Sequence, residues 1–282
     1  MRWLVVGAAG MLGTDLVGVV REHGHDVDGV DRAEVDITVP GALASHVRGR
    51  DVVVNCAAWT AVDDAESHEA QAFTLNATAA ALVASAAADA GARLVQISTD
   101  YVFDGTATSP YAEDAPLAPR SAYGRTKAAG EWAVRTLAPD HLVVRTAWLY
   151  GAHGHCFPKT IASAGAARGA LQVVDDQVGQ PTWTRDLAAL IVALVEAAAP
   201  AGVYHGTSAG QVSWWEFARA VVAAAGMDPQ IVARSATDPS ARPAPRPAYS
   251  VLGHDALRRV GVEPIGPWDE RWARAAAQVL AG

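Results

Sequence analysis

Tyr123 and Lys127 lie four residues apart in the segment SAYGRTKAAGE, and together they could transfer a proton. The segment predicts the start of a helix, and residues i and i+4 of a helix lie on one face. An isolated phenol has a pKa of about 10, which is high for proton exchange at neutral pH, and a nearby ammonium favours its ionised form. We therefore expect Lys127 to lower the pKa of Tyr123, and Tyr123 to act as a general acid toward a carbonyl oxygen.

Thr99 and Asp100 end the run ARLVQISTD, which predicts a buried strand ahead of the tyrosine helix. Ligands of open α/β sheets bind at the carboxyl ends of the strands, so both residues belong to the expected site. The Thr99 hydroxyl is expected to hydrogen-bond a substrate carbonyl oxygen. The alternative role for Thr99 is that of a helix or turn cap.

Three glycines, Gly7, Gly10 and Gly13, predict a dinucleotide site in the segment GAAGMLG. They follow the apolar run MRWLVV and open a helix through Met11 and Leu12. Without Cβ atoms the backbone can turn tightly and approach a pyrophosphate, which the helix N-terminus also attracts. The spacing is GxxGxxG rather than the commoner GxGxxG, and a plain strand-to-helix turn is the alternative interpretation.

Asp31 ends the following strand about twenty residues later, where an acidic residue accepts hydrogen bonds from the adenosine ribose. Its neighbour Arg32 can instead pair with a 2′-phosphate, because a planar guanidinium matches phosphate geometry. NADH and NADPH therefore remain alternatives, and an exposed pair at a strand end is the interpretation without a ligand. A reduced nicotinamide would supply hydride to the carbonyl carbon while Tyr123 protonates the oxygen.

The elements that must hold these residues alternate between strands and helices. Further β-branched runs, HDVDGVD, DVVVNCAA and HLVVRTA, are separated by alanine-rich helical stretches such as 76–90. This order predicts an α/β fold with a doubly wound parallel sheet of the Rossmann type. After Gly151 the rhythm changes, with helices expected over 157–168 and 184–199. We predict a dinucleotide-binding domain of residues 1–150 with parts of 184–205, and a smaller substrate-binding lobe of residues 151–183 and 206–282.

Composition argues against several other classes of protein. Hydrophobic residues make up 51% of the chain, as in globular enzymes, and the apolar runs 51–58 and 187–194 are too short to span a membrane. A net charge of −8 argues against general nucleic-acid binding. Cys56 and Cys156 form no metal motif and are expected as reduced thiols. Since the first strand begins at the N-terminus with no leader ahead of it, the sequence predicts a cytoplasmic protein.

The chain resembles the extended short-chain dehydrogenases, and most closely the dTDP-4-dehydrorhamnose reductases, in six segments: GAAGMLG, NCAAWTAVDDAE, STDYVF, YGRTK, RTAWLYG and DDQVGQPT. The resemblance covers nearly the whole chain. It implies a Rossmann domain, a C-terminal sugar-nucleotide lobe, and NAD(P)H-dependent reduction of the 4-keto group of a dTDP-linked 4-keto-6-deoxyhexose in deoxysugar biosynthesis. The chain differs from the family pattern at Trp59, where Tyr or His is usual, and at HCF (155–157), where Asn commonly precedes Phe.

By position, the resemblance implies roles for further residues. Thr99, Tyr123 and Lys127 form the catalytic set, and Lys127 also binds the nicotinamide ribose. On the cofactor side the resemblance adds Asp36, Ile37, Ala57, Ala58 and Trp59. On the substrate side it adds Thr60, Val62, Trp148, Gln177, Gly179, Gln180, Pro181, Arg246 and Pro247. Trp148 is expected to wall the sugar pocket and Arg246 to meet the diphosphate, whereas the plain alternatives are a core aromatic and a surface charge.

A metal and an oligomeric state are left open by the sequence. Some family members use Mg²⁺, through acidic residues of the kind found here at Asp15 and Glu131. No spacing identifies a metal site, and surface helix carboxylates are the favoured interpretation. The expected partner is a dTDP-sugar, and a monomer and a homodimer both remain.

Two other functions compete with the reductase. An epimerase or dehydratase would retain its NAD through the turnover, but dehydratases typically follow the threonine with an Asp-Glu pair, and here Tyr101 stands after Asp100. A non-catalytic regulatory subunit would bind the dinucleotide only as a sensor. The retention of Thr99, Tyr123 and Lys127 argues against that role, because a sensor needs no proton donor.

Overall fold

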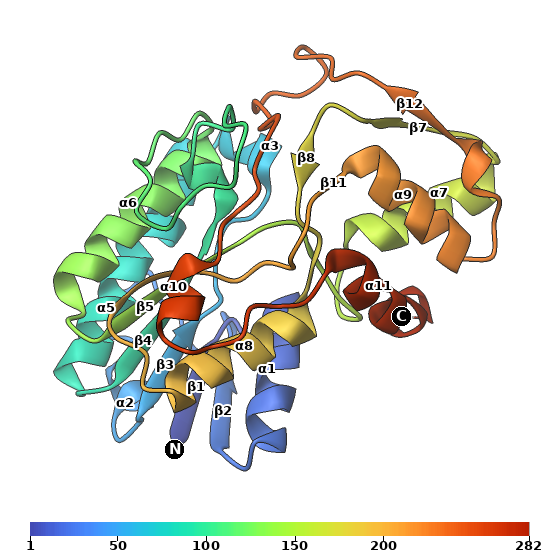
Figure 1. The fold of residues 1–282 in the computed structure, drawn as a ribbon. Helices are drawn as coiled ribbons and strands as arrows, with labels where there is room; N and C mark the ends of the chain where they lie inside the picture. The colour runs from blue at the N-terminus through green and yellow to red at the C-terminus, as the bar shows by residue number, and fades with distance from the viewer. Residues whose placement is uncertain (282) are drawn as a thin grey trace.

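A six-stranded parallel sheet forms the centre of the molecule (Figure 1). The structure, a computed structural model, describes residues 1–281. The strands of the sheet are β1 (Arg2–Val6), β2 (Asp26–Val30), β3 (Val52–Asn55), β4 (Arg93–Thr99), β5 (His141–Thr146) and β10 (Gly202–His205). In the order β10-β5-β4-β3-β1-β2, β2 is added on one side of β1 and the strands from β3 onward on the other side. The order of connection therefore reverses between β1 and β3. Such a reversal opens a crevice at the carboxyl edge, where α/β proteins bind their ligands.

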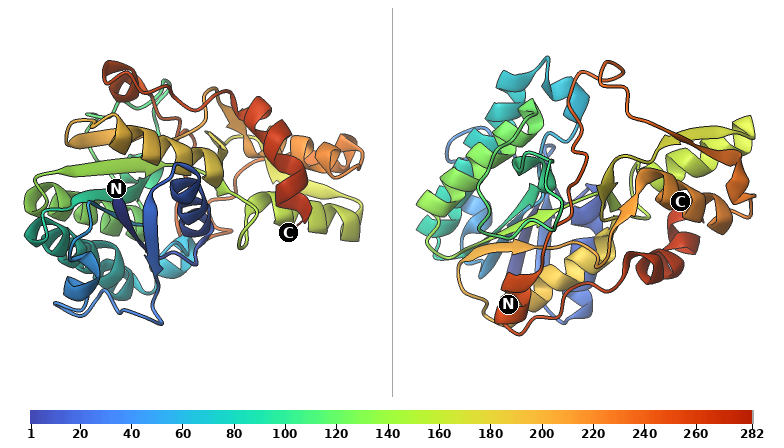
Figure 2. Two further views of the ribbon diagram at one scale, coloured as in Figure 1. Left: turned by 90° about the horizontal axis from the view of Figure 1, so that it is seen from below. Right: turned by 45° about the horizontal axis from the view of Figure 1, so that its top comes forward.

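Both faces of the sheet are buried, because successive residues of each strand enter different cores. Trp3 and Val5 of β1 pack with α1 (Met11–Glu22), α8 (Thr184–Glu196) and α10 (Asp255–Arg259). Leu4 and Val6 pack on the opposite face with α2 (Ala44–Val47), α5 (Ala79–Asp89) and α6 (Ala122–Leu137). Figure 2 shows the sheet between these two helical layers. The expected α/β fold with a doubly wound parallel sheet is confirmed, as are the expected strands.

A second core lies beside the sheet and is built largely from aromatic residues of the C-terminal half. Its main elements are α7 (Phe157–Arg168), β7 (Leu171–Val174), α9 (Trp214–Ala224), β12 (Val232–Ser235) and α11 (Trp268–Ala281). Short elements complete the fold: α3 (Val62–Ala65), α4 (Glu69–Phe73), the π-helix η1 (Thr74–Thr78), η2 (Asp100–Val102), β6 (Leu149–Tyr150), β8 (Val178–Gly179), β9 (Thr182–Trp183), β11 (Val212–Ser213) and η3 (Pro229–Ile231). The division into two domains stays a prediction, and α10 packs with the sheet rather than with the C-terminal elements.

The helical stretch Glu69–Asp89 is long and apolar enough, by length and composition alone, to cross a membrane. Its alanines, among them Ala79, Ala80 and Ala84, are buried against the sheet, and small side chains let the helix approach closely. This packing is typical of a core helix.

A buried ion pair connects the helical layer to the strands. The Arg145 guanidinium donates to both oxygens of Glu131 at 2.9 and 2.8 Å, and both side chains are almost completely buried. The Ser98 hydroxyl donates to the same carboxylate at 2.5 Å. Since each charge depends on the other for compensation, the pair ties α6 to β4 and β5 directly below the carboxyl edge.

Replacing Arg145 alone should be strongly destabilising. Arg145→Met leaves the buried Glu131 carboxylate without its guanidinium partner, which should lower the free energy of unfolding by about 3–5 kcal/mol. The double variant Glu131→Leu/Arg145→Met should recover part of that loss, since both members of the buried pair are then replaced by apolar side chains. Equilibrium urea unfolding measures both. A loss below about 1 kcal/mol in the single variant would contradict this account.

Candidate active site

The glycine turn after β1 packs closely against its own backbone and leads into a helix N-terminus. Gly7 has φ +79°, and a Cβ there would lie 2.8 Å from the Ala57 amide nitrogen. A Cβ on Gly13 would lie 2.1 Å from the Gly7 carbonyl oxygen, so this turn accepts no side chain at either position. Helix α1 begins at Met11, and its N-cap residue Gly10 offers no side-chain acceptor. Its first N–H groups are therefore available to an anion, as a dinucleotide requires.

Asp31 lies at the end of β2, against this turn. Its carboxylate accepts a hydrogen bond from the Ala9 amide at 2.5 Å. Arg32 is exposed, and none of the ion pairs within residues 1–281 involves it. Asp36 is exposed and accepts from the Thr38 amide and hydroxyl at 2.9 and 2.6 Å, and these bonds lower the pKa of Asp36. Ile37 is buried in the core, which argues against extensive contact with adenine.

Tyr123 occupies the first turn of α6. The Ser121 hydroxyl caps this helix by accepting from the Gly124 amide at 3.1 Å. Burial raises the pKa of Tyr123 to about 12, although hydrogen bonding to Thr99 opposes the rise. A phenol with this pKa stays protonated at neutral pH, which suits a proton donor.

Lys127 follows one turn later, and its ammonium is held by the backbone of β4. Its Nζ donates to the Ile97 carbonyl at 2.7 Å, and burial lowers the pKa of Lys127 to about 8. The pKa of Tyr123 is set by burial, Thr99 and Asp100 instead. The prediction that Lys127 lowers the pKa of Tyr123 stays a prediction.

Thr99 takes the alternative role of a cap, and its expected hydrogen bond to a substrate stays a prediction. It caps η2 by accepting from the Tyr101 amide at 3.2 Å, and it lies against Tyr123. Its hydroxyl donates to Asp100 at 2.9 Å. Asp100 is 3% exposed, and burial raises the pKa of this carboxyl to about 6. Asp100 therefore holds the Thr99 hydroxyl from a buried position. Its burial argues against the predicted contact between Asp100 and a substrate.

The segment after β3 runs along the same edge. Ala57 touches the Gly7 turn, and Ala58 and Trp59 follow, all three partly buried. The Trp59 backbone is held by Asn76, which accepts from its amide at 2.8 Å and donates to its carbonyl at 3.1 Å. Thr60 is exposed at the end of this segment.

Asn76 is a residue of the site that the sequence did not reveal. Its amide also donates to the Thr126 hydroxyl at 3.0 Å, so it links the Trp59 segment to the tyrosine helix. It lies in the π-helix η1, and π-turns often occur at functional sites. A π-helix does not visibly change the apolar pattern of an alanine-rich helical stretch, so periodicity alone could not locate it.

A cavity of about 1050 Å³ opens between the C-terminal elements and the edge of the sheet. Its apolar wall comes from α7, β7 and Trp214, and Tyr101 lies in its lining. Three arginines also line it, Arg168, Arg242 and Arg246. Tyr101 meets Tyr123 edge-on with ring centroids 5.6 Å apart, so the cavity reaches the neighbourhood of the tyrosine. Its size and its cations suit a large anionic ligand.

The predicted substrate residues divide between the cavity and the interior. Gln177 and Arg246 line the cavity, and Pro247 packs against Gly105 beside it. Val62 packs with Tyr123 and Tyr101. These positions agree with the expected arrangement, although their contacts with a ligand stay predictions.

Gln180 lies in the interior instead. Its Oε1 accepts from the Thr207 hydroxyl and the Leu252 amide, both at 2.8 Å, and its Nε2 donates to the Leu252 carbonyl. It is 2% exposed. These internal bonds join β8 to the chain near Leu252 and argue against the predicted contact with a sugar. The carbonyl of the next residue, Pro181, accepts from Ser208 in the same interior.

Trp148 adopts an unusual backbone conformation. Its φ of +48° is costly for a residue with a bulky side chain. Its indole stacks on Trp214 with centroids 3.5 Å apart, and a Cβ on Gly179 would lie 2.5 Å from the ring. Since Trp214 lines the cavity, the stacked pair lies at its apolar wall.

The two acidic residues considered for Mg²⁺ have other partners. Glu131 is engaged by Arg145 and Ser98. Asp15 is buried and accepts from the Thr184 hydroxyl at 2.5 Å, with His153 3.7 Å away. Within residues 1–281 no group of three or more His, Cys, Asp or Glu side chains could hold a metal ion.

Comparisons with known proteins agree with this arrangement. The family model described as the RmlD substrate binding domain matches residues 1–281. The chain is 49% identical to the dTDP-4-keto-6-deoxy-D-glucose reductase of Streptomyces niveus, covering 95% of this chain and 93% of the relative. It is 46% identical to the dTDP-4-dehydrorhamnose reductase of Streptomyces griseus, covering 95% and 90%. The crystal structure of the dTDP-4-dehydrorhamnose reductase of Bacillus anthracis, in complex with NADP, superposes with a TM-score of 0.94 at 36% identity, covering 98% and 99%.

These matches confirm the resemblance found in the six sequence segments. They extend it from the glycine turn to the last helix. The chain belongs to the RmlD substrate binding domain family, the family of the dTDP-4-dehydrorhamnose reductases.

Proposed function

We propose that this chain is an NAD(P)H-dependent reductase that converts the 4-keto group of a dTDP-linked 4-keto-6-deoxyhexose into an alcohol in deoxysugar biosynthesis. One observation carries the proposal. Tyr123 and Thr99 lie together at the sheet edge that carries the glycine turn, next to a cavity lined by arginines. A reductase of a nucleotide sugar needs these three features in one place.

The dinucleotide fits the turn between β1 and α1. Gly7 and Gly13 allow the tight backbone packing of this turn, where a Cβ would collide with backbone, and the uncapped start of α1 supplies N–H groups for the pyrophosphate. Asp31 is positioned for the adenosine ribose, and Lys127 for the nicotinamide ribose. When bound, the reduced nicotinamide supplies the hydride.

Tyr123 donates the proton. As negative charge develops on the substrate's carbonyl oxygen, the phenol transfers its proton there, and the alcohol forms. Burial holds the pKa of Tyr123 at about 12, so the phenol is protonated before the reaction. Thr99 lies against the phenol and orients it, and Asp100 fixes the Thr99 hydroxyl.

The cavity provides the site for the sugar nucleotide. Its apolar wall suits the base and the deoxysugar, and Arg246 with Arg242 suits the diphosphate, since guanidinium groups bind phosphate oxygens in pairs. Trp214 contributes aromatic surface to that wall, and Trp148 stacks on its indole. Where a dehydratase would carry the second acid of its pair, Tyr101 contacts Tyr123 and lines the cavity, which favours a reductase.

The function is tested with purified protein and a panel of dTDP-linked 4-keto-6-deoxyhexoses. NADH and NADPH are compared, and the configuration of the product is determined by NMR. Oxidation of the reductant matched by formation of a 4-hydroxy sugar would support the proposal. Turnover without added reductant would indicate an epimerase or dehydratase with retained NAD, and dinucleotide binding with no turnover would indicate a regulatory subunit.

Tyr123→Phe removes the proton donor and little else. We expect kcat to fall by about 10²–10⁴-fold, the usual contribution of a general acid. The dissociation constant for NADPH should stay nearly unchanged. Tyr204→Phe is the matched control, because that hydroxyl only donates to the Pro200 carbonyl in the β10 region. A kcat near that of the parent would remove Tyr123 from the proposed role.

Arg32→Ala tests the choice between the two dinucleotides. Because the exposed guanidinium can pair with a 2′-phosphate, its loss should raise the dissociation constant for NADPH by about tenfold or more. The dissociation constant for NADH should stay nearly unchanged. Arg48→Ala, at another exposed arginine, is the control. Calorimetric titration with each dinucleotide measures the effect. Equal losses for both would place Arg32 outside the 2′-phosphate site.

A further inference from the structure

One wall of the cavity is a loop that crosses from the C-terminal elements back to the sheet. We call residues 237–247 the strap. It follows β12 and runs toward α3 in Figure 1, and most of its residues line the cavity. At its beginning, the Thr237 amide and hydroxyl donate to Asp176 at 2.8 and 2.6 Å. This end is therefore fixed to the C-terminal elements.

The other end of the strap is held by a single carboxylate of the sheet domain, Asp63. Arg246 donates to Asp63 through Nη2 at 2.6 Å, and Arg242 through Nη1 at 3.1 Å. The Ala244 amide donates to the other oxygen at 3.3 Å. All three donors belong to the strap. The Asp63 side chain is 31% exposed and that of Arg246 is 15% exposed, so solvent screens this contact only in part.

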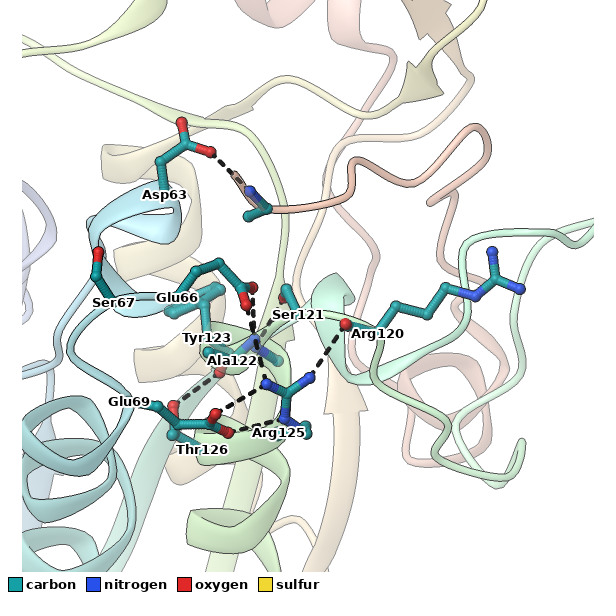
Figure 3. Close-up of polar contacts among 12 residues, drawn as sticks. Asp63, Glu66, Ser67, Glu69, Arg120, Ser121, Ala122, Tyr123, Arg125 and Thr126 are labelled. Carbon is teal, nitrogen blue, oxygen red and sulfur yellow. Dashed lines mark hydrogen bonds and ion pairs between the residues drawn. The ribbon is translucent and has the colours of Figure 1, made fainter. Parts of the chain in front are cut away.

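Asp63 lies on α3, and α3 packs against α6, the helix that carries Tyr123. Two positions further along α3 than Asp63, Ala65 is fully buried against Ala122 and Tyr123. Glu66 then accepts from the Ala122 amide at 2.8 Å (Figure 3). Asp63 is thus a fixed point relative to the first turn of α6, where Tyr123 lies.

A second ion pair strengthens this attachment from the surface. Arg125 of α6 donates to both oxygens of Glu69 at 2.8 and 2.9 Å (Figure 3). The α3–α4 segment is therefore joined to α6 at two places, once at the helix start and once one turn along it. A strap held by Asp63 has a defined position relative to Tyr123.

We propose that Asp63 is a positioning residue that latches the strap over the sugar-nucleotide cavity and orients Arg246 toward the ligand's diphosphate. The inference rests on the proposed function. A guanidinium has five N–H donors in a planar fork, and Asp63 engages only one of its terminal nitrogens strongly. Nη1 donates to the Ala244 carbonyl at 3.4 Å, and the N–H groups of Arg246 that neither partner uses stay available to phosphate oxygens, with their direction fixed in advance. Ordering the strap before binding removes an entropy cost from the binding step.

The same contacts also allow the opposite role for Asp63, in which its carboxylate weakens binding of the ligand. If the carboxylate competed with the diphosphate for the same N–H groups, removing its charge would strengthen binding. The two roles therefore predict changes of opposite sign in the affinity for a dTDP ligand, and one titration separates them.

Asp63→Asn is the first test, with dTDP as the probe in isothermal titration calorimetry. We expect the dissociation constant for dTDP to rise about tenfold, which corresponds to about 1.4 kcal/mol. The KM for the keto-sugar should rise in proportion, with the effect falling on KM rather than on kcat. Asp63→Glu keeps the charge and should recover most of the affinity. NADPH affinity and the unfolding temperature report on intact folding.

Asp64→Asn is the matched control, because this neighbouring carboxylate pairs with His68 rather than with the strap. It should leave the affinity for dTDP unchanged. Unchanged or tighter binding of dTDP by Asp63→Asn would overturn the latch. If the parent protein binds no dTDP, the proposed function fails instead, so the two failures are distinguishable.

Discussion

The parallel alignment of the strands is the constraint on which the site depends. Because β1, β3 and β4 run in one direction, the segments that follow them emerge at one edge, although they are far apart in the sequence. The glycine turn, the Trp59 segment and Thr99 meet there. Burial of both faces keeps the strands in register, and the Glu131–Arg145 pair fastens the tyrosine helix to the same strands.

Burial, more than charge pairing, sets the proton chemistry of this edge. Tyr123 and Lys127 both lie in a region where ionisation is unfavourable, so the phenol holds its proton more firmly and the ammonium less firmly than in water. The first effect keeps the tyrosine protonated, as reduction of a carbonyl requires, and it also makes the phenol a weaker acid. The lysine ammonium is kept in place by the Ile97 carbonyl.

The sequence predicted the strands, the glycine turn and the order of the site segments, because these depend on local periodicity and on residues with special backbone freedom. It did not predict Asn76, Asp63 or Glu66, whose roles depend on partners 17 to 183 positions away. Lys127 and Gln180 show the same limit. Their residue types suggested action on a phenol and on a sugar, but the tertiary structure supplies each with an internal hydrogen-bond partner.

The Trp148–Trp214 stack restricts how the apolar wall of the cavity can diverge among related enzymes. Three segments contribute to it: the turn after β5, the glycine of β8 and the start of α9. A side chain at 179 would displace the Trp148 indole, and a smaller residue at 148 would leave Trp214 without its stacking partner. Positions 148, 179 and 214 should therefore covary in the family, and a redesigned sugar preference on this side requires changing them as a set.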